Sequence, residues 1–357
     1  MASVEVIITS YKNPVYLREC LLSLISQSFQ DFEVTIVDDN SPDDPISVIQ
    51  DLLDANRKIH YSRNVTNCGG PSSFFNVSTR GKSKYLMWLH HDDFLHPTFL
   101  EKSVEALEKN QHCGFSYSLC SRVINGVPRE EFPGSIRPNL ETGAHDISFD
   151  SVINCWIMWS CALIRRETFN LIGGIAALHS RYIGRNLDPN YSSCSDLYIF
   201  ARLSCFSPTY VLNERLCFYR DHPDATTNDA DLNFNHIMGN VRTYDCIFDD
   251  VSFFSEEVRV VAKINSIGRL CLGDVGLAAT AAQLLYIGQL GKEFRHIRRE
   301  VVQKLAVVMR RYIMDRLGLQ DVCHFSAKDI YLMDRLASIS DSFSRQEIQR
   351  LITECQN

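Results

Sequence analysis

The sequence predicts an α/β protein in which a mainly parallel central sheet is followed by a helical C-terminal region. Strand-like and helix-like segments alternate over the first hundred residues, and two of the strands end in paired aspartates. A βαβα succession favours parallel strands joined by right-handed crossovers. Beyond residue 228 the chain has few of the turn-forming residues that separate short strands, and its apolar residues recur at helical spacing. Both features indicate helices.

Each element of the first hundred residues has its own local signal. Runs rich in β-branched and aromatic residues indicate strands, and apolar residues three and four apart indicate helices. Pro14 is a favourable first-turn residue for the first helix, and turn formers after Asp39 separate the second strand from the second helix. The predicted elements are strand 4–11, helix 14–29, strand 34–37, helix 46–55, strand 58–64 and strand 85–89.

Composition narrows the class of protein. The 357 residues are 45% hydrophobic and 22% charged, as in an ordinary globular protein with one large domain and a smaller one. The net charge of −7 argues against a nucleic-acid partner, because proteins that bind nucleic acid concentrate positive charge. Thirteen cysteines without a C-x-x-C pair indicate scattered reduced thiols, rather than a disulfide framework or a zinc site. Small-molecule or saccharide partners fit better.

The chain begins with a strand-like run and has no basic n-region followed by an apolar h-region. We therefore expect a cytoplasmic protein without a secretory signal. The most apolar late stretch, residues 275–291, contains glutamines and glycines and falls short of a membrane span, so we expect a buried helix there.

Two predicted strands end in acid pairs, Asp38–Asp39 and Asp92–Asp93. The carboxyl ends of parallel strands meet at one edge of the sheet, where such folds bind ligands. Each pair alone is also a common turn or helix cap. Two pairs at one edge would repel each other without a cation or hydrogen-bond donors, and hard divalent metals prefer carboxylate ligands. The convergence favours a nucleotide or metal site over a purely structural role.

These blocks resemble those of an inverting family 2 glycosyltransferase with a GT-A fold, a Rossmann-like architecture. The resemblance rests on the run VEVIITSYKNP through VDDNSPDD and on YLMWLHHDDFLHP, and it extends over about residues 3–225. It implies a catalytic domain at residues 1–228, with a nucleotide-binding half (1–110) and an acceptor-binding half (111–228). The helical region would occupy residues 229–357. We read residues 125–146, which are low in hydrophobicity, as a linker inside the acceptor half.

The resemblance also implies a role for each matching residue of the first half. Thr9 and Tyr11 would line the base pocket, with the Tyr11 ring against uracil or a related pyrimidine. Asp39 would accept a hydrogen bond from the base N3–H, which discriminates between bases. Asp92 would approach the ribose, and Asp93 would ligate Mn²⁺ or Mg²⁺ bridging the diphosphate.

The spelling HHDD departs from the commoner Asp-x-Asp of that family. Asp93 still supplies the oxygen ligand, and manganese also accepts imidazole, so His91 is compatible with a metal site. Taken one by one, His90, His91 and His96 are more often polar strand-end residues than ligands.

The acceptor half supplies the expected catalytic base. In the block SDLYIFARL, Asp196 matches the second acid of the family, while Ser195 stands where the first acid usually lies. The resemblance makes Asp196 the base that deprotonates the acceptor hydroxyl, and helix capping by either residue is the alternative. In the later block YRDH, it implies that Arg220 offsets phosphate charge and that His222 reaches the metal or the diphosphate.

The C-terminal region carries one apolar stripe on a basic helix. Residues 292–316 contain eight Lys/Arg against three Asp/Glu. We favour a helix packed on the catalytic domain or across a homo-oligomer interface, and the alternative is peripheral contact with an anionic membrane. The stripe consists of Phe294, Ile297, Val301, Leu305, Val308 and Tyr312.

We therefore expect an inverting, metal-dependent enzyme that moves a sugar from a UDP- or dTDP-sugar to a hydroxyl of a saccharide, glycolipid or glycoprotein acceptor. One alternative is a non-catalytic nucleotide-sugar-binding or scaffold protein on the same fold, because Ser195 breaks the acidic pair. A sugar nucleotidyltransferase is another, although the glycine-rich, basic N-terminal signature of that class is missing. A glycan-polymerising enzyme is disfavoured because the sequence has no stretch that reads as a membrane span for export.

Overall fold

The computed structural model describes residues 2–129, 140–148, 151, 157–174, 195–223, 225 and 247. Contacts divide the chain into residues 1–235 and 236–357, and every helix and strand described below belongs to the first unit. The predicted boundary at residue 228, the helix at 275–291 and the stripe from Phe294 to Tyr312 lie outside the described residues.

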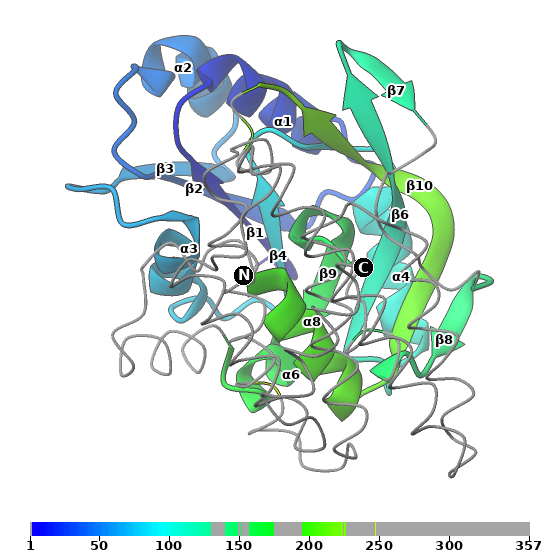
Figure 1. Ribbon diagram of the computed structural model, residues 1–357. Helices are drawn as coiled ribbons and strands as arrows, with labels where there is room; N and C mark the ends of the chain where they lie inside the picture. Colours follow the sequence, from blue (N-terminus) through cyan, green and yellow to red (C-terminus); the bar gives the residue numbers. More distant parts are fainter. Residues whose placement is uncertain are drawn as a thin grey trace, which may run out of the picture. The chain divides into compact units, whose positions relative to one another are not determined.

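A ten-stranded mixed sheet forms the centre of the first unit (Figure 1). The strands are β1 (Val4–Ser10), β2 (Phe32–Asp38), β3 (Ile59–Arg63), β4 (Tyr85–His90), β5 (Phe94–Leu95), β6 (Phe115–Ile124), β7 (Val127–Arg129), β8 (Gly143–His145), β9 (Ala162–Arg165) and β10 (Thr209–Asp221). Their order is β3-β2-β1-β4-β9-β6-β10-β5, with β7 on β6 and β8 on β10.

Strand direction separates the sheet into a parallel part and a mixed part. The pairs β3/β2, β2/β1 and β1/β4 are parallel, as the βαβα succession predicts. Strand β9 runs antiparallel to both β4 and β6, and β6 is parallel to β10. Strands β6 and β10 therefore point the same way as the first four strands, and their carboxyl ends face the same edge.

Helices cover both faces of the sheet. They are α1 (Pro14–Ile25), α2 (Pro45–Ala55), α3 (Gly70–Ser78), α4 (Phe99–Lys109), α6 (Arg166–Leu171) and α8 (Ser195–Phe206), with the 3₁₀ turn η1 (Trp159–Cys161) before β9. One core joins α1, α2 and α4 to alternate residues of the strands, among them Val6, Ile8 and Met87. Figure 1 shows α1 beside α2 and α6 beside α8.

Aromatic side chains form the core on the other face. Phe74 of α3 stacks on Trp88 of β4 with ring centroids 4.4 Å apart, and Trp159 lies 4.9 Å from Trp88. Phe200 of α8 lies 5.1 Å from Trp159. Because both faces are covered, the strand from Tyr85 onward is apolar at successive positions, as in other doubly covered sheets.

The predicted elements of the first hundred residues are confirmed, with the first helix ending at Ile25 rather than near residue 29. Helix α3 was not predicted, because the run GPSSFFNVS has the composition of a turn. The predicted linker at 125–146 is wrong where β7 and β8 lie. These strands have three residues each and pair at the ends of longer strands. They are too short, and too rich in turn residues, to show a strand pattern in the sequence.

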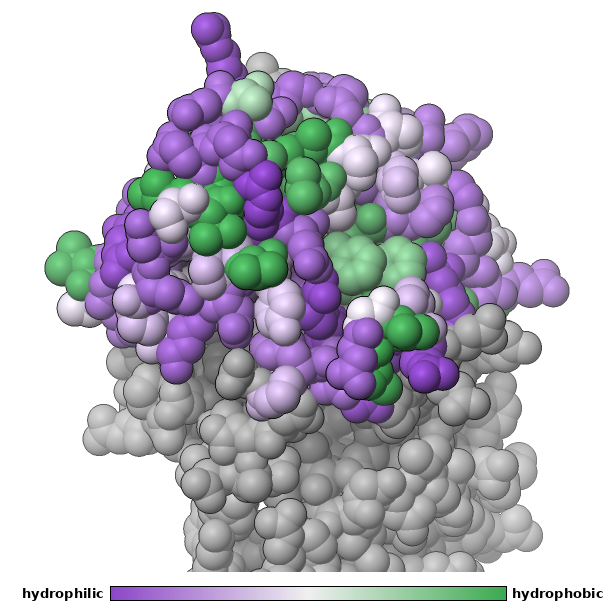
Figure 2. Space-filling view, turned by 90° about the horizontal axis from the view of Figure 1, so that it is seen from above, coloured by the Kyte–Doolittle hydropathy of each residue, from purple (hydrophilic) through white to green (hydrophobic). Residues whose placement is uncertain are grey.

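The described surface carries scattered hydrophobic residues. Figure 2 shows one face, on which hydrophobic residues gather in small groups between hydrophilic ones. Val65 and Leu171 are the most exposed of the large apolar residues described, at 93% and 71%. Within the part of the chain that the structure describes, no helix combines the length and the apolar character that crossing a membrane requires.

Arg166 ties α6 to β1 and to the connection before β4. Its guanidinium is buried, and it donates from Nε to the Ser83 carbonyl and from Nη1 to the Ser78 carbonyl, both at 2.7 Å. It also pairs with Glu5 of β1, whose side chain is 13% exposed. Removing the guanidinium would leave a shielded carboxylate and two carbonyl oxygens without these donors.

We expect Arg166→Ala to lower the free energy of unfolding by about 3–5 kcal/mol, the usual cost of removing one partner of a buried ion pair. Urea denaturation followed by tryptophan fluorescence measures the loss. The control is Arg18→Ala, which removes the exposed pair with Asp51 and should cost about 1 kcal/mol or less. Equal losses in the two variants would contradict the structural role of Arg166.

Candidate active site

The ends of β1, β2 and β4 bring most of the predicted donor-site residues to one edge of the sheet. Thr9 is paired in parallel register with Val37 of β2 and with His90 of β4. The residues that follow these strands, which include Tyr11, Asp39 and the second acid pair, therefore emerge at the same edge. This convergence was predicted from strand order alone.

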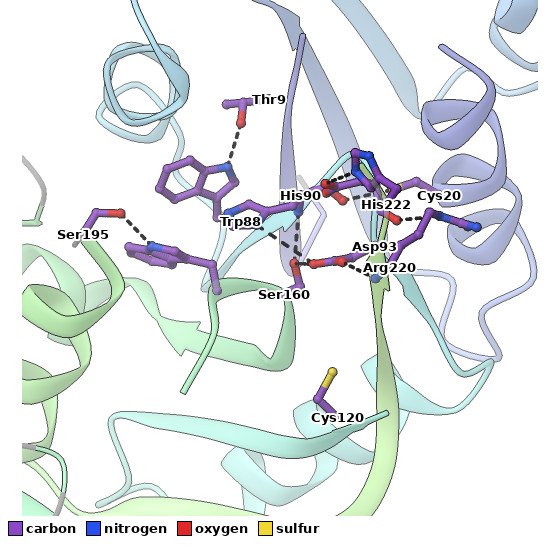
Figure 3. Close-up of polar contacts among 12 residues, drawn as sticks. Thr9, Cys20, Trp88, His90, Asp93, Cys120, Ser160, Ser195, Arg220 and His222 are labelled. Atoms are coloured by element: carbon purple, nitrogen blue, oxygen red, sulfur yellow. Dashed lines mark hydrogen bonds and ion pairs between the residues drawn. The ribbon is translucent and has the colours of Figure 1, made fainter. Parts of the chain in front are cut away.

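Of the second pair, Asp92 and Asp93, Asp93 is the more buried acid, with 1% of its surface exposed. Its Oδ2 accepts a hydrogen bond from the Ser160 hydroxyl at 2.5 Å, and its Oδ1 accepts from the Arg220 backbone N–H at 3.2 Å (Figure 3). Ser160 Oγ in turn accepts from the His90 backbone N–H at 3.1 Å. Burial, together with the negative charge of Asp92, raises the pKa of Asp93 well above its usual value.

Asp92 has the opposite electrostatic environment. Burial would raise its pKa, but the hydrogen bond that His222 Nε2 donates to Asp92 Oδ2 at 3.2 Å, together with His91 and His90, lowers that pKa below its usual value. Arg220 donates from Nε to the Asp92 carbonyl at 3.0 Å. The two acids are thus held differently, with Asp92 favoured as the carboxylate.

Arg220 is anchored by groups other than the acid pair. Its guanidinium pairs with Glu19 of α1 and lies 4.6 Å over the Tyr16 ring and 5.3 Å over the Phe94 ring. With its backbone N–H on Asp93 and its Nε on Asp92, the residue fixes the turn that carries both carboxylates.

The second acid pair has a donor set that fits a divalent cation. One ligand atom each from His90, Asp92 and Asp93 lie within 4.8 Å of one another. Carboxylate oxygens suit Mg²⁺ and Mn²⁺, and the imidazole favours Mn²⁺ of the two. The sequence predicts His222 as a metal ligand and His90 as a polar strand-end residue. In the structure His222 contacts Asp92, and His90 lies with Asp92 and Asp93 in the group that could hold a cation.

Asp39 holds the segment that leads into α3. Its Oδ1 accepts from the Asn64 amide at 2.8 Å, the Cys68 backbone N–H at 3.0 Å and the Ser73 hydroxyl at 3.0 Å, and its Oδ2 accepts from the Gly69 N–H at 2.7 Å. Burial is outweighed by these hydrogen bonds, so the pKa of Asp39 is lowered. The predicted contact with a base N3–H would add to these bonds.

Sequence reasoning missed the four residues that donate to Asp39. The available signal was NCGG, in which Gly69 has a φ of 83° that favours glycine and precedes the first residue of α3. A glycine turn opening a helix after a strand is a common anion-binding arrangement. Here the anion that the turn receives is the Asp39 carboxylate.

The two acids of the first pair have separate tasks. Asp38 is fully buried and accepts from the Ser41 hydroxyl and, at 2.9 Å, from the Tyr61 hydroxyl. It also pairs with Arg63 at 3.1 Å. Asp38 therefore fixes the turn after β2 and the position of β3, which leaves the second pair as the source of cation ligands.

Thr9 and Tyr11 differ in exposure. Thr9 is 8% exposed, and its Oγ1 accepts a hydrogen bond from Trp88 Nε1 at 3.0 Å. Tyr11 is 41% exposed, so its ring is presented at the edge of the sheet where a planar ligand could stack. Thr9 supports the floor of this region from within the core.

Helix α8 presents Asp196 in its first turn, where Asp196 Oδ1 accepts from the Leu197 N–H at 2.8 Å. Ser195 is buried and accepts from Trp159 Nε1 at 3.1 Å (Figure 3). The serine that replaces the expected acid therefore anchors α8 to η1. The residues just before Ser195 are outside the described part, so its capping role stays a prediction.

Comparison with known proteins agrees with this architecture. The model of glycosyl transferase family 2 matches residues 5–172. An uncharacterized glycosyltransferase of Haemophilus influenzae is 30% identical over 275 residues, which cover 75% of this chain and 79% of that protein. An uncharacterized glycosyltransferase of Rickettsia prowazekii is 29% identical over 156 residues, covering 40% of this chain and about half (48%) of that protein.

Two solved structures share the fold at low sequence identity. Staphylococcus aureus TarS 1-349 in complex with UDP has a TM-score of 0.56 and 16% identity, with 95% of this chain and 90% of that chain covered. Mannosyltransferase PcManGT from Pyrobaculum calidifontis, in complex with GDP-Man and Mn²⁺, has a TM-score of 0.51 and 13% identity, with 88% and 85% covered.

The fold and the acid-lined edge of the sheet define a transferase of the GT-A class, which confirms the expected fold. The chain belongs to glycosyl transferase family 2.

The opposite pKa shifts of the two acids give a prediction for metal-free protein. Because the pKa of Asp93 is raised, its carboxylate destabilises the fold once the pH exceeds the unfolded pKa of about 3.9. The pKa of Asp92 is lowered, so its carboxylate stabilises the fold over the same range and that stability is lost as the pH falls. At neutral pH with EDTA, we expect Asp93→Asn to raise the melting temperature and Asp92→Asn to lower it.

Thermal melts from pH 4 to pH 8 measure both effects. The Asp93→Asn difference should shrink toward pH 4, whereas the Asp92→Asn difference should persist there, because the stability from a lowered pKa is lost only below the unfolded pKa of about 3.9. Adding Mn²⁺ should raise the melting temperature of the wild type but not that of Asp93→Asn. A lowered melting temperature for Asp93→Asn in EDTA would show that the Asp93 carboxylate does not destabilise the metal-free fold.

Proposed function

We propose that this protein is an inverting, metal-dependent glycosyltransferase that moves a sugar from a UDP- or dTDP-sugar to a hydroxyl of a saccharide, glycolipid or glycoprotein. The observation that carries the proposal is the His90, Asp92 and Asp93 cluster at the end of β4. It lies at the same sheet edge as Tyr11 and Asp39. The UDP and GDP-Man complexes of the two similar structures support a nucleotide-sugar donor.

In this proposal the donor lies across the ends of β1, β2 and β4. The exposed ring of Tyr11 stacks on the pyrimidine, and Thr9 supports the pocket from below. Asp39, kept ionised by its hydrogen bonds, accepts from the base N3–H. Asp92 approaches the ribose, and Arg220 adds positive charge near the diphosphate.

The cation in this proposal is Mn²⁺ or Mg²⁺ held by Asp93, with His90, Asp92 and His222 as neighbouring groups. When bound, it would stabilise the negative charge that develops on the leaving diphosphate. The protein holds Asp93 in place through Ser160 and the Arg220 backbone. These donors leave carboxylate lone pairs for a metal, because each oxygen accepts one of the two bonds.

Asp196 is our candidate for the general base. The acceptor hydroxyl oxygen would attack the anomeric carbon from the face opposite the diphosphate, its proton would pass to the Asp196 carboxylate, and the bond to the diphosphate would break. One displacement inverts the configuration, so no glycosyl-enzyme nucleophile is needed. The hydrogen bond that Trp159 Nε1 donates to Ser195 Oγ supports this role, because it fixes the start of the helix that carries Asp196.

A non-catalytic nucleotide-sugar-binding protein is the second candidate, favoured by the serine in place of the neighbouring acid. We also keep as predictions a cytoplasmic location, contact with a membrane surface and a homo-oligomer formed through the C-terminal helices. None of these concerns the described residues.

We expect UDP or dTDP to bind far more tightly with Mn²⁺ than with EDTA, because the cation offsets repulsion between the diphosphate and the acid pair. Titration calorimetry with UDP, dTDP, GDP and ADP measures this. Asp93→Ala should abolish the metal dependence, while the exposed control Asp51→Ala should bind like the wild type. Equal affinity for ADP, or unchanged metal dependence in Asp93→Ala, would refute the donor assignment.

We expect Asp196→Asn to bind the donor almost as the wild type does and to lower transfer at least about a hundredfold, the usual scale for losing a general base. The rate is measured with a nucleotide-sugar and acceptor pair found by screening. Glu167→Gln removes an exposed acid of the same half and serves as the control. If Asp196→Asn transferred at the wild-type rate, another base would replace Asp196 in this assignment. If the wild type transferred sugar to no acceptor in the screen, the second candidate would stand instead.

A further inference from the structure

Three cysteines far apart in the sequence meet beside the active site. The sulfur atoms of Cys120, Cys161 and Cys217 lie within 4.8 Å of one another. All three are free thiols. They come from β6, η1 and β10, so no local sequence motif indicates the cluster. The prediction of scattered thiols is therefore wrong for these three.

The sheet explains why the thiols meet. Cys217 is the register partner of Cys120 in the parallel pair of β10 and β6, and the register shifts between Arg215 and Cys217. Such irregularities re-aim side chains. Cys161 ends η1, where its N–H bonds to the Met158 carbonyl, and the next residue, Ala162, pairs with Tyr117 of β6. The turn thus delivers the third sulfur to the other two.

Burial and charge suit a bound cation. Cys161 and Cys217 are 3% and 0% exposed, while Cys120 is half-buried. Hydrogen bonds with Cys161 and Cys217 lower the pKa of the Cys120 thiol. The hydrogen bond to Cys120 raises the pKa of Cys161, and burial raises that of Cys217. Arg215 donates to the Cys120 carbonyl at 2.8 Å, and its positive charge also lowers the pKa of the Cys120 thiol.

We propose that Cys120, Cys161 and Cys217 bind one thiophilic divalent cation of the Zn²⁺ class. At a Zn–S distance of about 2.3 Å, three thiolates around one zinc lie roughly 4 Å apart. The three sulfurs here lie within 4.8 Å of one another, which is compatible with that spacing. Water would serve as the fourth ligand. Arg215 would offset part of the negative charge of the three thiolates.

This site differs in chemistry from the acid cluster nearby. Thiolates select soft or borderline cations, whereas the carboxylates of Asp92 and Asp93 select Mg²⁺ or Mn²⁺. The two sites are joined by η1, in which Ser160 bonds to Asp93 and Cys161 belongs to the thiol cluster. A cation on the three sulfurs would therefore brace the turn that holds Asp93.

The test uses the whole 357-residue chain, reduced with a phosphine and stripped of metal. Cd²⁺ is titrated while the ultraviolet thiolate-to-metal charge-transfer band is followed, and Zn²⁺ is then used in competition. We expect one equivalent of metal to produce the band and to raise the melting temperature. Cys161→Ser and Cys120→Ser should each fail to bind this one equivalent of metal. Cys120 is half-buried, so a loss of binding in Cys120→Ser is not explained by a folding defect.

Two controls separate this site from other metal binding. Cys113→Ser removes a buried thiol just before β6 that is outside the cluster, and it should keep the band. Asp93→Asn should also keep it, because the acid cluster does not use sulfur. The proposal is overturned if the wild type gains no more band than a variant with all three cysteines replaced, or if Cys161→Ser and Cys120→Ser both bind as the wild type does.

Discussion

Two carboxylates side by side at the end of β4, one of them almost fully buried, are the constraint on which this structure depends. Burial and the negative charge of Asp92 both disfavour the Asp93 carboxylate, so hydrogen-bond donors are needed to offset them. The Ser160 hydroxyl and the Arg220 N–H supply those donors, and His222 satisfies Asp92. Two adjacent carboxylates are tolerated where a cation binds between them. The elements around Asp92 and Asp93 each contribute a contact that holds this pair.

The short turn η1 connects the acid pair to the thiol cluster and to helix α8. Its Trp159 bonds to Ser195 at the start of α8, Ser160 bonds to Asp93, and Cys161 joins the thiol cluster. Strand β9, which follows η1, lies antiparallel between β4 and β6 and so sets the turn against the ends of the parallel strands. Movement of η1 would disturb the acid pair and the candidate base together.

The sequence predicted what local pattern and strand order determine. The strand and helix units up to β4 follow from residue spacing, and Asp39 and Asp93 reach one edge because parallel strands share a direction. It did not predict the contacts that depend on long-range pairing. Ser160 is an unremarkable serine in sequence, and Cys120 and Cys217 become neighbours only through the register of β6 and β10.

The central claim is that the Asp92 and Asp93 pair is the cation centre of a nucleotide-sugar transferase. Diffraction from crystals grown with UDP and Mn²⁺, measured for manganese anomalous scattering, tests it most directly. We expect one peak coordinated directly by an Asp93 oxygen and by the diphosphate, with His90 and Asp92 around it. A bound nucleotide with manganese held elsewhere, or with no manganese at this pair, would contradict the account.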